Sequence, residues 1–208
     1  MSGTFPATPA PAQISVRSLT PSKVSLGHSL KRQTRSLGGQ RWSFRLAWAP
    51  MTQAQFAPIF GFCMAQRGQY GAFTFQLPSR AWPLIGAGGG TPTVNNQAGS
   101  PEELQAGARN VVTAAWTGGQ TNVLRAGDFI QFAGHTKVYI VTADANSDGG
   151  GGATISIEPA LIVGPAHGAA ITVGPSVSFN CALASDLQEA GVFQRGGNSA
   201  FYRYELDL

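Results

Sequence analysis

The sequence predicts a mainly β protein that contains one helix and, in its second half, a small β-barrel or sandwich. Short segments alternate between apolar and polar residues, glycines and prolines separate these segments, and only one run has apolar residues at helical spacing. The 208 residues include 12 Phe, 4 Trp and 4 Tyr. This apolar content allows a chain of such length to bury roughly 70% of its unfolded surface, which excludes global disorder.

The first expected elements are an N-terminal arm and two short strands. Residues 1–13 form the arm, because the three prolines within residues 6–12 remove backbone donors and favour an extended chain. The alternation of apolar and polar residues then predicts strands over 14–19 and 24–26.

The clearest strand of the sequence covers residues 41–48. Every second side chain of a strand points to the same face of its sheet, so Arg41 and Arg45 share one face. The opposite face, which we expect to be buried, carries Trp42, Phe44, Leu46 and Trp48.

The single helix is expected over residues 53–67, directly after this strand. Thr52 is a suitable N-cap, and Pro58 also permits a later start near Ala57. Apolar residues recur at steps of three and four, namely Phe56, Ile59, Phe60, Cys63 and Met64. Another alternating strand is expected over residues 73–77.

The second half of the chain divides into a loop-like segment and a strand-rich region. Residues 86–119 are rich in Gly, Thr and Asn, which indicates a linker or a long loop. Residues 120–199 contain short β-branched or aromatic segments between turns, including a hairpin over 129–142, as in a small β-barrel. A last strand is expected over residues 200–208.

No constellation of residues indicates catalysis, a cofactor or a metal. The three histidines, His28, His135 and His167, stand apart in expected loops, and no Gly-x-Ser-x-Gly motif is present. The run 144–149 resembles a calcium loop, but Ile155 occupies the position of the closing acidic ligand. We therefore expect a protein that is not an enzyme.

The two cysteines, Cys63 and Cys181, have neither CxxC nor paired-histidine spacing. This pattern favours two buried thiols over a disulfide framework or a zinc site. The N-terminal residues lack the basic and apolar regions of a secretory signal, and no run of about 18 apolar residues is present. We therefore expect synthesis in the cytoplasm.

The charges of the chain are few and unevenly distributed. Only 12% of the residues are charged and the net charge is +4, but the first acidic residue is Glu102. Nine basic side chains precede Glu102, whereas five basic and ten acidic residues make up the charges from there on. The first half can therefore attract a polyanion, an acidic protein or the second half of another copy.

Several segments resemble tail proteins of tailed bacteriophages, and most of all the distal tail protein family. These segments are residues 39–44, 51–58, 66–68, 73–78, 124–132, 137–141, 147–149 and 157–161. The resemblance implies a β-sandwich ring domain over 14–85, completed by the strand 200–208, and a small barrel over 120–199. It implies no catalytic residues.

The resemblance further implies a virion protein that forms a ring, as a hexamer, at the distal end of the tail. The ring joins the tail tube protein to the tail hub or receptor-binding proteins, with no membrane in the assembled state and no specific nucleic-acid binding. Because a DNA channel favours an acidic lining, we expect the cations at subunit boundaries. The expected interface residues are Arg17, Arg41, Arg45, Asp128, Glu189, Glu205 and Asp207.

Two other functions are compatible with the sequence. A small β-barrel often holds oligosaccharides on an open face, so the second half is also a candidate carbohydrate or host-surface binding module. The basic first half would also suit a nucleic-acid binder, whose affinity would fall steeply with salt.

Overall fold

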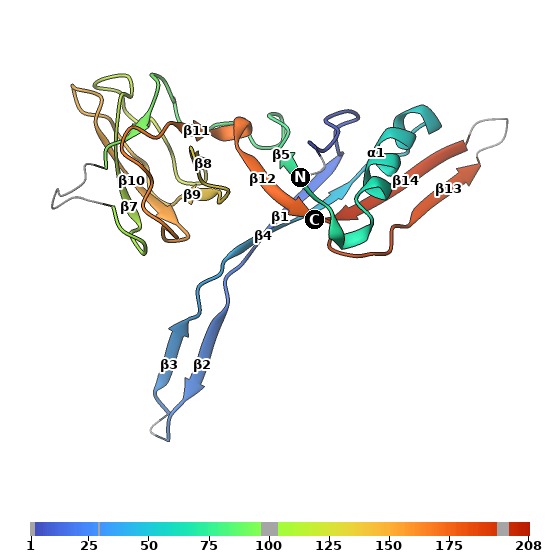
Figure 1. Ribbon diagram of the computed structural model, residues 1–208, viewed down its shortest axis with the longest axis horizontal. Coiled ribbons are helices and arrows are strands. Elements are labelled where there is room, and N and C mark those ends of the chain that lie inside the picture. Colours follow the sequence, from blue (N-terminus) through green and yellow to red (C-terminus); the bar gives the residue numbers. More distant parts are fainter. Residues whose placement is uncertain (1–2, 29, 97–103, 195–199) are drawn as a thin grey trace. The chain divides into compact units, whose positions relative to one another are not determined.

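The computed structural model describes residues 3–28, 30–96, 104–194 and 200–208, and it confirms a mainly β protein (Figure 1). The chain divides into two compact units. The sheet unit comprises Pro6–Ala72 and Cys181–Leu208, and the barrel unit comprises Phe73–Asn180 together with Gly3–Phe5. None of the helices in the described ranges is long and apolar enough to cross a membrane.

The sheet unit is built on a four-stranded antiparallel sheet in the order β1-β4-β14-β13. The expected buried face of residues 41–48 is confirmed for Phe44 and Leu46, which are fully buried, and for Trp48, which is nearly so, whereas Trp42 is half-buried. The strands are β1 (Gln13–Leu19), β4 (Arg41–Ala47), β13 (Ala190–Gln194) and β14 (Ala200–Asp207).

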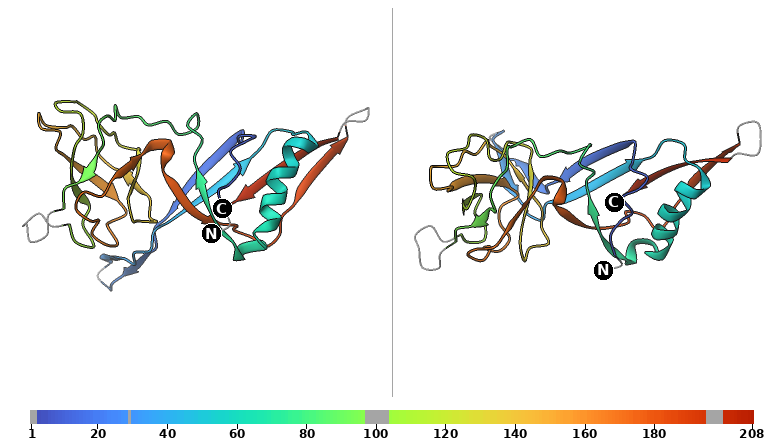
Figure 2. Two further views of the ribbon diagram at one scale, coloured as in Figure 1. Left: turned by 45° about the horizontal axis from the view of Figure 1, so that its top comes forward. Right: turned by 90° about the horizontal axis from the view of Figure 1, so that it is seen from above.

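Helix α1 (Gln53–Ala65) covers the apolar face of this sheet beside β14 (Figure 2). It begins after Thr52, whose backbone N–H donates to Oε1 of Gln55 at 3.1 Å in a capping box. The expected helix is therefore confirmed, although it ends two residues earlier than predicted and contains Pro58. The ring of Phe56 stacks on Tyr202 with centroids 4.7 Å apart. The short helix η1 (Gly68–Tyr70) follows α1.

A long hairpin continues from β1 and β4 beyond their paired ends (Figure 1). Its strands, β2 (Ser22–Leu26) and β3 (Arg32–Ser36), pair with each other, and every residue of both strands is exposed. We refer to residues 20–39 as the basic hairpin, because Lys23, Lys31, Arg32 and Arg35 lie in it and no acidic residue does.

The barrel unit contains a six-stranded sheet in the order β11-β8-β9-β10-β7-β6, which is nearly closed. The two outer strands approach each other, because Val94 donates its N–H to the carbonyl of Ala169 and Thr93 bridges Ala170. The strands are β6 (Thr93–Val94), β7 (Asn110–Ala114), β8 (Phe129–Phe132), β9 (Tyr139–Val141), β10 (Ala153–Glu158) and β11 (Ile171–Val173). This arrangement confirms the small barrel and the expected hairpin of β8 and β9.

Strands β5 (Ala72–Gln76) and β12 (Ser178–Ala182) pair in a separate two-stranded sheet. The chain passes from the sheet unit to the barrel unit in β5 and returns in β12. The short helix η2 (Gly174–Ser176) precedes β12.

The segment 86–119, expected to be a linker or a long loop, instead contributes β6 and β7 to the barrel sheet. Its few apolar residues are enough for these strands, since Val94 and Val111 are almost fully buried. Glycines in this segment allow its backbone to pack closely against neighbouring segments of the chain. A Cβ added at Gly90, where φ is +71°, would lie 2.2 Å from the carbonyl oxygen of Ala115.

Candidate assembly surface

One face of the four-stranded sheet carries most of the charged residues that were predicted from the sequence to lie at an interface. Paired residues of adjacent strands share a face, and the pairs Ser15–Arg45 and Asp207–Arg45 therefore fix which residues lie together. We call this side, which faces away from α1, the polar face. It carries Gln13, Ser15, Arg17, Arg41, Ser43, Arg45, Arg203, Glu205 and Asp207.

Five of the seven predicted interface residues thus come together on the polar face, namely Arg17, Arg41, Arg45, Glu205 and Asp207. A sixth, Glu189, stands one residue before β13 and lines the same hollow as Glu205 and Asp207. The contribution of these residues to an interface stays a prediction, but the fold places them on one continuous surface.

Within this surface, Arg45 and Glu205 already pair inside one chain. The Nη2 atom of Arg45 lies 2.6 Å from Oε2 of Glu205, and Nη2 of Arg203 lies 3.3 Å from Oε1 of the same carboxylate. The hydrogen bond and positive charge of Arg45 lower the pKa of Glu205 below its ordinary value. Arg45 was expected to meet an acid of a neighbouring copy, and the structure gives it a partner 160 residues away in its own chain.

This ion pair leads to a pH prediction. Because the folded pKa of Glu205 is depressed, its stabilising effect is present above the ordinary carboxyl pKa and lost as the pH falls through the folded pKa. Replacing Arg45 with alanine should raise the pKa of Glu205 towards its ordinary value. Carbon-detected NMR titration of the side-chain carboxyl measures this shift, and an unchanged pKa would contradict the assignment of Arg45 as the main partner.

Other charges of the polar face have no ion-pair partner in the part of the chain that the structure describes. Arg17 lines a hollow with Gln13, Ser15 and Arg45, and Arg41 lies at the opposite end of β4. Asp207 lies beside Arg45 in the sheet register, while Glu205 takes the close contact with that arginine. These groups remain available for polar contacts with a partner.

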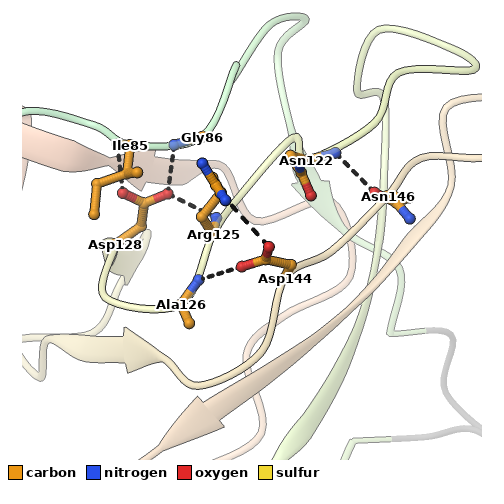
Figure 3. Close-up of polar contacts among 8 residues, drawn as sticks. All are labelled: Ile85, Gly86, Asn122, Arg125, Ala126, Asp128, Asp144 and Asn146. Carbon is orange, nitrogen blue, oxygen red and sulfur yellow. Dashed lines mark hydrogen bonds and ion pairs between the residues drawn. The ribbon is translucent and has the colours of Figure 1, made fainter.

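Asp128 does not belong to this surface, and its predicted role at an interface is not supported. It lies in the barrel unit with no exposed surface. Its carboxylate accepts backbone N–H groups from Ile85 at 2.7 Å, Gly86 at 2.9 Å and Arg125 at 2.8 Å (Figure 3). A buried carboxylate that accepts from three backbone donors holds loops together and is not accessible to a neighbour's arginine.

The run 144–149, considered above as a calcium loop, has a similar structural role. Oδ1 of Asp144 accepts the N–H of Ala126 at 2.9 Å, and Oδ2 lies 3.5 Å from Nε of Arg125 (Figure 3). Oδ1 of Asn146 accepts the N–H of Asn122 at 2.7 Å (Figure 3). In the described ranges, no group of three His, Cys, Asp or Glu side chains is arranged to hold a metal ion.

Some residues of the surface were not identified from the sequence. Arg203 joins the Glu205 pair, and Leu187, with 75% of its surface exposed, lines the hollow beside Glu189. The period-two pattern of β14 places Arg203 on the same side as Glu205, but only the strand pairing shows what lies opposite it.

Comparison with known proteins gives a family match for the barrel unit. Residues 89–173 match the family model described as the B domain of the distal tail protein pb9, and this range contains every strand of the six-stranded sheet. A search of curated proteins gave no match. The family implies a virion component that contacts other tail components. The match to this domain supports assignment of the chain to the distal tail protein family of bacteriophages.

Proposed function

We propose that copies of this chain form a closed hexameric ring at the distal end of the phage tail. The ring connects the tail tube to the hub or receptor-binding apparatus and performs no catalysis. The family supports a structural role in the tail. The ring itself is inferred from the edges of the four-stranded sheet.

Both edges of this sheet lack a further strand among the described residues, and they run in opposite directions. The order β1-β4-β14-β13 is antiparallel throughout, so β1 and β13 are antiparallel to each other. When β1 of one copy is placed beside β13 of another, the antiparallel pattern therefore continues. Such a contact joins two different surfaces, and repeated contacts of this kind close into a ring when the rotation allows it.

The two faces of the sheet also suit a ring. Helix α1 covers the apolar face, whereas the polar face presents Arg17, Arg45 and Asp207 to solvent. A continuous sheet of several copies would place all the helices on one side and all the polar faces on the other. An open strand edge otherwise favours aggregation, and closure removes that edge.

The proposal predicts that the purified full-length chain forms one discrete oligomer, with a mass of six copies of 21.7 kDa. Mass photometry over a concentration series measures the population, and negative-stain electron microscopy shows whether the particles are closed. Immunogold labelling of purified virions should place the protein at the distal tip of the tail. A chain that stays monomeric at high concentration and is absent from virions would contradict the proposal.

A further inference from the structure

The basic hairpin has two unlike faces. The strand register pairs Lys23 with Arg35 on one face, and it places Val24 and Leu26 on the other, where Leu26 lies opposite Arg32. Val24 and Leu26 are 50% and 68% exposed, so both apolar side chains of this face are open to solvent.

The cationic face needs a partner. Lys23 and Arg35 lie directly opposite each other, and like charges in this position destabilise a strand pair. Neither side chain has an ion pair within the described ranges, and residues 20–39 contain no acid. A two-stranded hairpin is only marginally stable by itself in water. The cationic face of the hairpin therefore gains stability from a surface that bears carboxylates.

Such a surface exists on the polar face, in a hollow of about 370 Å³ at the start of β13. We call it the acidic hollow. It combines carboxylates with apolar side chains, and Glu189 and Asp207 have no ion pair among the described residues. Its lining consists of Ser185, Leu187, Gln188, Glu189, Gly191, Arg203, Glu205, Leu206 and Asp207.

The edge-to-edge contact places these two surfaces near each other. Because β1 of one copy runs antiparallel to β13 of the next, the end of β1 at Leu19 approaches the start of β13 at Ala190. The basic hairpin follows Leu19, and the acidic hollow adjoins Ala190 through Glu189. The same geometry that continues the sheet therefore brings four cations to an acidic surface.

We propose that the basic hairpin of one copy docks in the acidic hollow of the next copy. Lys23 and Arg35, which share one face of the hairpin, contact Glu189 and Asp207. This contact rests on the proposed ring and names the surfaces that would hold it together. The proposed partner is a second copy of this chain, and binding of a nucleic acid to the hairpin is an outcome that the test can detect.

Zero-length crosslinking tests the contact in the unmodified protein. Equal amounts of ¹⁵N-labelled and unlabelled chain are assembled together and treated with a carbodiimide, which joins lysine amines to carboxylates. Peptides that link Lys23 or Lys31 to Glu189 or Asp207 should appear with mixed labels, which identifies them as contacts between copies. Linked peptides without mixed labels, or no such peptides from intact rings, would overturn the proposal.

Charge reversal provides an independent test. Lys23→Glu with Arg35→Glu should weaken assembly at least tenfold, and so should Glu189→Lys with Asp207→Lys. All four changes in one chain should restore most of the lost assembly. The control Arg80→Glu reverses an exposed cation of the barrel unit and should leave assembly unchanged. Circular dichroism checks that each variant is folded.

The outcomes separate this inference from the proposed ring. If the unmodified chain forms no closed oligomer, the proposed ring fails. If rings form and both charge-reversed pairs still assemble normally, only the docking contact fails. If Lys23→Glu with Arg35→Glu abolishes salt-sensitive binding to duplex DNA but not assembly, the hairpin's partner is a polyanion and the docking contact is overturned.

Discussion

Replacing Asp128 with alanine should destabilise the barrel unit by about 3 to 5 kcal/mol, because three partly buried backbone donors then lose their shared, buried acceptor. Each of these donors costs free energy when it is left unpaired, since its N–H has exchanged water for this carboxylate. The donors come from two segments, residues 85–86 and residue 125, so the carboxylate joins the chain entering the barrel to the turn before β8.

Two further variants make this expectation specific. Asp128→Asn keeps one oxygen at the Oδ2 position, which accepts from both Gly86 and Arg125, but it turns an amide donor towards the N–H of Ile85. We expect its effect to be about half that of the alanine variant. Asp144→Ala removes a carboxylate that is 46% exposed, and it should change stability by less than about 1 kcal/mol.

Differential scanning calorimetry of the full chain measures these effects. The transition of the barrel unit should move to lower temperature in the order Asp144→Ala, Asp128→Asn, Asp128→Ala. Equal shifts in transition temperature for Asp128→Ala and Asp144→Ala would show that the buried carboxylate stabilises the barrel unit no more than the exposed one does.

The elements with a strong local pattern were predictable from the sequence. Strand β4 follows from its alternation, and α1 follows from its apolar spacing and from Thr52 as N-cap. The β8–β9 hairpin also follows from a local signal, namely two apolar runs around a Gly-containing turn. In each case, the residues that determine the element are close together in the sequence.

The features that depend on distant partners were not predictable. Strands β6 and β7 lie in a segment of small and polar residues, and their pairing with each other and with β10 makes them strands. Asp128 looks like any acid next to a turn, but two of its donors lie 42 and 43 residues earlier in the chain. The charge separation selected Arg45 and Glu205 as interface candidates, but it did not show that they face each other in one sheet.

Helix α1 provides the second large expected effect. Phe56→Ala should destabilise the sheet unit by about 3 to 5 kcal/mol, because it removes a nearly buried ring from the contact between α1 and β14. The ring is only 8% exposed and has aromatic neighbours on several sides. It stacks on Tyr202 at 4.7 Å and on Phe60 at 5.1 Å, and it meets Tyr204 edge-on at 5.7 Å.

Two matched variants separate burial from aromatic contact in this cluster. Phe56→Leu keeps most of the buried apolar surface and loses the ring stacking, so it should lower stability by about 1 kcal/mol. Phe60→Ala removes a ring that is only partly buried, so its effect should be smaller than that of Phe56→Ala. Urea denaturation measures the free energies, and hydrogen exchange of β14 peptides shows whether the loss is local. If Phe56→Ala left exchange in β14 unchanged, the helix would not be holding the central strand on which both the polar face and the proposed ring depend.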